Sequence, residues 1–138
     1  MALREAEPRS SGFLRASAHQ FGNLPDMPMM VGFSAQRHEA LRREVERYVA
    51  MMPTLGVDRA LLIGDLAVGN VEPTTPVQLV VVHETDAPFS RRADFFYSHL
   101  EPRVALDVTV YTRDEFADIS ESETPAGRLI RSGDPIFG

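Results

Sequence analysis

The residues best suited to chemistry lie between Ile63 and Val82, in the segment IGDLAVGNVEPTTPVQLVVV. A turn that contains Gly64 and Gly69 leads through a short polar loop into an apolar strand. Alternate positions of a strand share one face, so two ligands spaced by one residue would lie side by side. A glycine turn that cradles phosphate, next to a strand that holds metal ions, is the layout of a nucleotide-transfer site.

Most of the groups that this chemistry requires are missing. Nucleotidyl transfer uses two divalent ions about 4 Å apart, and magnesium is bound by oxygen ligands, carboxylates above all. The alternate positions at the start of the strand are Pro76 and Gln78. Proline has no ligating side chain, and glutamine offers a neutral carbonyl oxygen.

The first long helix is predicted over residues 35–52. Apolar residues recur there at helical spacing, Ser34 is a suitable N-cap, and Pro53 and Gly56 are the expected end. Arginines and glutamates are interleaved along this helix (Arg37, Glu39, Arg42, Arg43, Glu44, Glu46 and Arg47). This interleaving favours a solvated face of mixed charge over a basic binding patch.

Further helices are predicted from capping signals. One begins at Ser90 and stops before Pro102. Another follows the capping box of residues 112–115, and a last one follows the N-cap and proline at residues 124–125 and ends near Gly133.

Strands are predicted at residues 59–63, 77–82 and 104–111, with a final extended segment at 135–137. The apolar run at 77–82 is nearly continuous, which is typical of a central strand covered on both faces. Residues 104–111 alternate between apolar and more polar positions, so Asp107 points away from the apolar face.

Residues 1–33 are predicted to form an N-terminal arm that is disordered or docks on a partner subunit, and residues 34–138 a single domain. Prolines and Ser-Ser-Gly and Gly-Asn pairs interrupt any periodicity in the arm. A domain of this size is large enough for a real core.

Composition excludes several classes of protein. The net charge of −6 argues against broad nucleic-acid binding, and no apolar run reaches the ~20 residues of a membrane span. The chain has no cysteine, which rules out disulfides, thiolate metal sites and a cysteine nucleophile. With no secretory signal recognisable at the N-terminus, we expect a cytoplasmic protein.

Taken together, four segments resemble the DNA polymerase β-like nucleotidyltransferase superfamily in its minimal form. The resemblance covers about residues 35–138. The matching segments are Gly64-Asp65-Leu66-Ala67-Val68-Gly69, Pro76-Val77-Gln78-Leu79, the strand around Asp107 with the helix start after it, and the C-terminal Ile130 to Phe137. The resemblance implies an α+β nucleotidyltransferase fold, with a mixed β-sheet flanked by helices on one side.

The resemblance also assigns roles to residues. Gly64, Asp65 and Gly69 would form the phosphate-binding turn, and Asp107 would be the catalytic carboxylate. Asp65 occupies the position of a family serine, and an ionised carboxylate there repels phosphate. Pro76 and Gln78 replace the family's Asp-x-Asp. We therefore expect a degenerate site, and Asp107 could also be a plain solvent-facing strand residue.

The expected protein is a pseudoenzyme that binds a nucleotide or a protein and needs no cofactor. The alternative is an active minimal nucleotidyltransferase that moves a nucleoside monophosphate from an NTP to a protein or small molecule. It would use Mg held by Asp65, Asp107 and Gln78. Minimal members of this superfamily often work beside a helical partner, so a helical partner protein, a homo-oligomer and an NTP are the partners to consider.

Overall fold

The computed structural model describes residues 28–138, with side chains from Ala35 onward. The chain is an α+β protein with a four-stranded mixed sheet, as the sequence predicts. Its elements are α2 (Pro28–Leu55), β1 (Arg59–Ile63), β2 (Val77–Val82), the 3-10 helix η1 (Phe89–Arg91), α3 (Arg92–Leu100), β3 (Leu106–Tyr111), α4 (Arg113–Ser120), α5 (Pro125–Ser132) and β4 (Asp134–Phe137).

The strands lie in the order β3-β2-β1-β4. β1 is antiparallel to both β2 and β4, whereas β2 and β3 are parallel. The parallel pair needs a crossover connection, which η1 and α3 supply. β2 is therefore an interior strand, as its continuous apolar run predicts.

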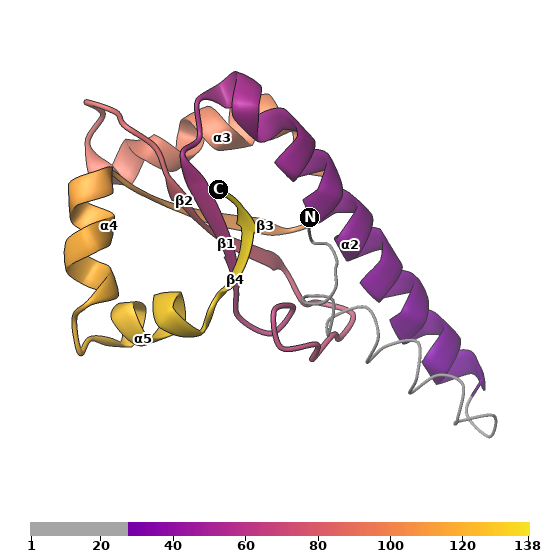
Figure 1. Cartoon of the computed structure of the whole chain (residues 1–138). Coiled ribbons are helices and arrows are strands. Elements are labelled where there is room, and N and C mark those ends of the chain that lie inside the picture. Colours follow the sequence, from indigo (N-terminus) through magenta and orange to yellow (C-terminus); the bar gives the residue numbers. More distant parts are fainter. Residues whose placement is uncertain (1–27) are drawn as a thin grey trace.

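Helices cover both faces of the sheet, so the expectation of helices on one side was wrong. One core joins α2 and α3 to alternate strand residues such as Leu62, Leu79 and Val108. A smaller core lies on the opposite face, where Leu61 and Val80 contact residues of α4 and α5. Figure 1 shows α2 and α3 on one side of the strands and α4 and α5 on the other. The second core forms because β1 and β2 are apolar on both faces.

α2 is longer than the sequence indicated. It begins at Pro28, so Ser34 lies within it and is not its N-cap. Pro53 lies inside the last turns and does not end the helix. The end is set by Gly56, whose φ of 77° lets its N–H donate to the Pro53 oxygen, while the Val57 N–H donates to the Met52 oxygen.

The early part of α2 overlaps the predicted N-terminal arm. Residues 28–33 belong to the helix, and residues 1–27 lie outside the described residues. The later helices follow the predicted signals: Thr112 and Glu115 form a capping box before α4, and Thr124 caps α5.

Glu44 on α2 is a buried carboxylate, not part of a solvated face. It is only 4% exposed. It accepts hydrogen bonds from Arg47 at 2.8 Å, from the Tyr48 hydroxyl at 2.8 Å and from the Arg103 N–H at 2.6 Å. Arg47 in turn donates to the backbone oxygens of Leu100 and Glu101, at the end of α3. This Glu44 cluster ties α2 to the connection between α3 and β3.

The hydrogen bonds of the Glu44 cluster hold the carboxylate in its ionised form. Burial alone would raise the pKa of Glu44, but the bonds from Arg47, the Arg103 N–H and Tyr48 outweigh burial and lower this pKa from 4.5 to about 2. Since one pKa unit corresponds to about 1.4 kcal/mol, ionised Glu44 contributes about 3 kcal/mol to stability near neutral pH.

We predict that Glu44→Gln lowers the free energy of unfolding at pH 7 by about 3 kcal/mol, because the buried partners lose their charge-assisted acceptor. Glu46→Gln is the matched control on the same helix. Glu46 pairs with Arg42 on the surface, so its loss should cost less than about 1 kcal/mol. Urea unfolding of both variants measures the difference, and equal losses would contradict the burial of Glu44.

The contribution of Glu44 should disappear in acid. Because its folded pKa lies below its unfolded pKa, the stabilisation is complete above pH 4.5 and is lost as the pH falls towards about 2. The stability gap between the wild type and Glu44→Gln should therefore narrow over this range. Urea titrations at a series of pH values test this, and a gap that is unchanged at the acid end would refute it.

Candidate functional site

The predicted phosphate-binding turn follows the end of β1. The Ala67 N–H donates to the Gly64 oxygen, the Gly69 N–H to the Leu66 oxygen, and the Asn70 N–H to the Asp65 oxygen. Gly64 and Gly69 both have a φ of 81°, which side chains disfavour. The two glycines are therefore explained by the conformation of the turn itself, and three of its N–H groups are already bonded within it.

Gln78 packs directly against Gly64. A Cβ placed on Gly64 would lie 1.9 Å from Oε1 of Gln78, so any side chain at this position would displace the carboxamide. Gln78 therefore occupies the space beside the turn with a neutral amide, at a position where the resembled family has a metal-binding carboxylate.

Asp107 lies next to Gln78 on the sheet. Gln78 pairs with Ile63 on β1 and with Asp107 on β3, so the three residues form one row across the strands. Paired residues of neighbouring strands point to the same face. Asp107 is exposed and Gln78 is partly buried. The structure thus brings together Gly64, Gln78 and Asp107 at one end of the sheet.

Asp65 is separated from Asp107 by the whole of β2. It is exposed on the turn after β1, whereas Asp107 lies on β3. Strands two positions apart are ~10 Å apart, since each spacing is ~4.8 Å. Gly69 lies at the far end of the turn, with no atom within 4 Å of a Cβ placed on it. The predicted site residues therefore occupy one region without forming one cluster.

A small cavity of about 240 Å³ lies between the turn and the end of α5. Its lining residues are Ile63, Gly64, Asp65, Ala67, Val68, Leu129, Ser132 and Gly133. Asp65 is the one ionisable side chain among them, and it carries negative charge. Two apolar side chains at this cavity are strongly exposed, Val68 at 77% and Leu129 at 46%.

These donor groups do not fit the two-ion site of the resembled family. The row offers one amide oxygen from Gln78 and one carboxylate from Asp107, and Asp65 lies beyond the neighbouring strand. Two magnesium ions held in an octahedral oxygen environment need more carboxylates than this. Among residues 28–138, no three His, Cys, Asp or Glu side chains are grouped as a metal site.

The walls that α5 adds to the cavity were not predicted from the sequence. Leu129 follows the turn by sixty positions, and only the tertiary fold brings it, Ser132 and Gly133 to the turn. A sequence signal was present in the adjacent pair Leu129-Ile130, because neighbouring residues of a helix point in different directions and cannot both lie on one buried stripe. In the structure Ile130 is buried and Leu129 is exposed.

Comparison of the chain with known protein families, with curated proteins and with solved structures finds no match. No helix within residues 28–138 is both long and apolar enough to cross a membrane.

We predict that Gly64→Ala is more destabilising than Gly69→Ala. Both glycines have the same φ, which costs about 1–2 kcal/mol for a residue with a side chain. Only Gly64 also contacts Gln78, so we expect Gly64→Ala to cost about 1 kcal/mol more than Gly69→Ala. Thermal or urea unfolding measures both variants.

The double variant Gly64→Ala/Gln78→Ala isolates the contact. Removing the carboxamide should return the cost of the alanine at 64 to that measured at 69, because only the backbone term remains. Equal destabilisation by Gly64→Ala and Gly69→Ala would refute the close packing of Gln78 on Gly64. So would a double variant in which Gln78→Ala does not reduce the cost of the alanine at 64.

Proposed function

We propose that this chain is a nucleotidyltransferase-like protein that has lost catalysis and binds a partner protein through the surface around the Gly64–Gly69 turn. The observation that carries the proposal is the nature of that surface: a small cavity with an apolar rim, whose one ionisable residue is Asp65. The degenerate site expected from the sequence supports a loss of catalysis, and the apolar surface supports binding to a protein.

The order of the elements supports the nucleotidyltransferase-like part of the proposal. A strand, a glycine turn, a second strand and a third strand with Asp107 follow each other as in the resembled superfamily, but the helix that the superfamily has after the glycine turn is absent between β1 and β2. Asp107 in register with Gln78 agrees with the alignment that places Gln78 at a former ligand position.

Nucleotide binding at the turn is disfavoured by charge and by size. A triphosphate carries several negative charges and is normally met by Lys, Arg, a metal ion or unpaired N–H groups. Among the side chains described, from Ala35 onward, the cavity is lined by Asp65 and by no Lys, Arg or His. Its volume of about 240 Å³ also lies below the ~300 Å³ that is typical of small-molecule sites.

A protein partner suits the same surface better. Val68 and Leu129 are exposed apolar side chains, and together with Ala67 they form an apolar rim around Asp65. A helix that presents an apolar side chain beside a lysine or arginine would bury the rim and pair with Asp65. We therefore propose a helical partner protein with that chemistry.

The second candidate function is an active minimal nucleotidyltransferase with a rearranged magnesium site. One observation favours it: Gln78 and Asp107 are in register, so an amide oxygen and a carboxylate lie side by side at the end of the sheet. In this alternative the turn would have to move Asp65 towards Asp107, because the strands that carry the two residues are separated by β2.

Calorimetry with ATP, GTP, CTP and UTP, each with and without magnesium, separates the two candidates. We expect no saturable heat in any titration, because the turn offers a carboxylate where phosphate would sit. Micromolar, magnesium-dependent binding that Asp107→Ala abolishes would establish the second candidate in place of the first.

Restoring the family residues provides a positive test of the same proposal. The variant Asp65→Ser/Pro76→Asp/Gln78→Asp re-creates the serine and the Asp-x-Asp of the resembled superfamily beside Asp107. We expect it to gain magnesium-dependent NTP binding that a further Asp107→Ala removes. Circular dichroism checks that the variant is folded. If the folded variant still binds no NTP, the proposal that this is a degenerate nucleotidyltransferase site is contradicted.

Sedimentation velocity tests whether the partner is a second copy of the chain. If the partner is a different, helical protein, we expect the chain alone to sediment as a monomer of 15.3 kDa. A dimer that Val68→Asp dissociates would instead assign the surface to self-association.

A further inference from the structure

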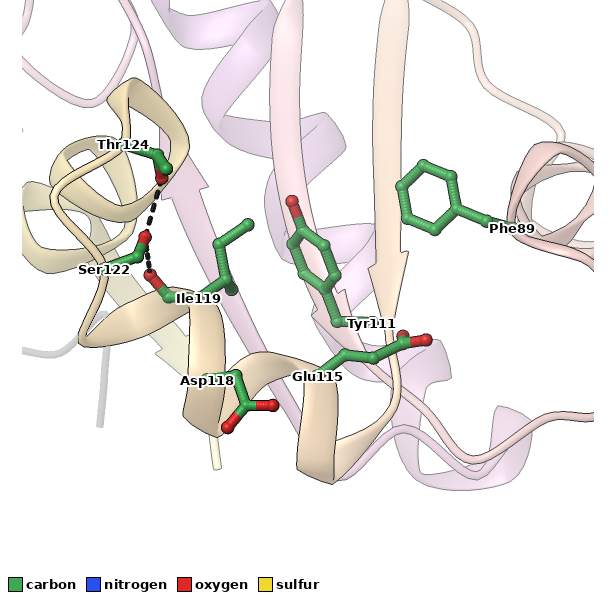
Figure 2. A pocket seen from close by; sticks show the side chains of 7 residues that line it. All are labelled: Phe89, Tyr111, Glu115, Asp118, Ile119, Ser122 and Thr124. Atoms are coloured by element: carbon green, nitrogen blue, oxygen red, sulfur yellow. Dashed lines mark hydrogen bonds between the residues drawn. The ribbon is translucent and has the colours of Figure 1, made fainter.

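A second, larger and more open cavity of about 440 Å³ lies away from the turn, between η1, β3, α4 and the connection between α4 and α5. Figure 2 shows its walls: Phe89 lies on one side, Ile119, Ser122 and Thr124 lie on the other, and Tyr111 is between them. Glu115 and Asp118, both on α4, complete the lining. Its volume falls within the range of known small-molecule sites.

The wall formed by α4 and its connection to α5 is fixed by short-range packing. The Ser122 hydroxyl lies 2.8 Å from the Ile119 oxygen and 2.7 Å from the Thr124 hydroxyl, as Figure 2 shows. Gly127 fits so closely that a Cβ there would lie 2.5 Å from the Ser122 oxygen. Arg131 donates to the backbone oxygens of Ser120 and Ser122. The shape of this wall is therefore built into the connection between the two helices.

The floor of the cavity is aromatic. The rings of Phe89 and Tyr111 lie 5.8 Å apart and are tilted by 36°. The Tyr111 hydroxyl makes no hydrogen bond with another described residue. Burial and the nearby Glu115 carboxylate raise the pKa of Tyr111, so its hydroxyl stays neutral and can donate. Two aromatic faces and one unused donor are suited to a planar or compact apolar body.

The charge around the cavity is negative. Residues 113–124 contain five acidic residues and one basic residue. Glu115 is paired with Arg92 at 2.6 Å, whereas the Asp118 carboxylate has no partner within residues 28–138. Arg92 lies beside the lining: its guanidinium is 5.5 Å from the centroid of the Phe89 ring and is paired with Glu115. Arg128 and Arg131 donate to backbone oxygens. Asp118 is therefore the charged lining residue that has no partner within residues 28–138.

We propose that this cavity binds a small organic cation that carries an aromatic ring, such as an arylalkylamine. Its ring packs on Phe89, Tyr111 and Ile119, and its ammonium group pairs with Asp118 at the rim. Aromatic faces attract cations electrostatically, which adds to the ion pair. This site is independent of the turn surface, because the two cavities share no lining residue.

Three probes of the same shape and different charge test the proposal: tryptamine, neutral tryptophol and anionic indole-3-propionate. Each is titrated into isotopically labelled full-length protein and followed by amide NMR shifts. We expect saturable shifts at Tyr111, Ile119 and Ser122, a tryptamine dissociation constant below about 1 mM, and affinity that falls from tryptamine through tryptophol to indole-3-propionate.

Variants identify the groups responsible. Asp118→Asn should weaken tryptamine about five-fold and leave tryptophol unchanged. Asp114→Asn, which removes an exposed carboxylate of the same helix outside the cavity, is the matched control and should change neither. Phe89→Ala should weaken both probes because the ring contact is lost. Absence of saturable shifts, equal affinity for all three probes, or an equal effect of the Asp118 and Asp114 variants would overturn the proposal.

Discussion

The structure depends on β2 being covered on both faces. Five of its six side chains are buried, and Gln78 is the one that is only partly so. α2 and α3 pack on one face and α4 and α5 on the other, so the strand must be apolar in both directions. Gln78, at the start of β2, is the one polar residue of the strand. The row of Ile63, Gln78 and Asp107 marks that place, and it is where the candidate site lies.

The row of Ile63, Gln78 and Asp107 shows why the loss of a metal ion would favour replacing a carboxylate at position 78. A carboxylate at position 78 would lie directly beside Asp107, and like charges paired across strands are destabilising unless a cation lies between them. Gln78 removes this repulsion, and its carboxamide fills the space over Gly64. A neutral amide at this position is thus the stable choice wherever no metal ion lies between the two strands. The apolar rim of Val68 and Leu129 beside it is consistent with a surface used for contact rather than for phosphate.

Local signals predicted most of the fold, and long-range contacts account for the errors. The capping box at Thr112, the cap at Thr124 and the strand at 77–82 are encoded within a few residues, and the structure contains all three. Pro53 was misread as the end of α2 because the Schellman geometry at Gly56 decides that end. Glu44 was placed on a solvated face because its partner Arg103 lies fifty-nine positions away. Neither cavity was predicted, because each is lined by segments far apart in the sequence: Ile63 meets Leu129 and Ser132 at one, and Phe89 meets Ser122 and Thr124 at the other.

The most direct test of the central claim is paramagnetic broadening by Mn²⁺, a substitute for Mg²⁺, in the presence of ATP. If the row at the end of the sheet no longer binds a metal–nucleotide complex, the amide signals of Gly64, Asp65, Gln78 and Asp107 should broaden no more than those of Asp114, an exposed acidic residue on another part of the chain. Selective loss of the four signals at substoichiometric Mn²⁺, reversed by Asp107→Ala, would contradict the account and place a working metal site there.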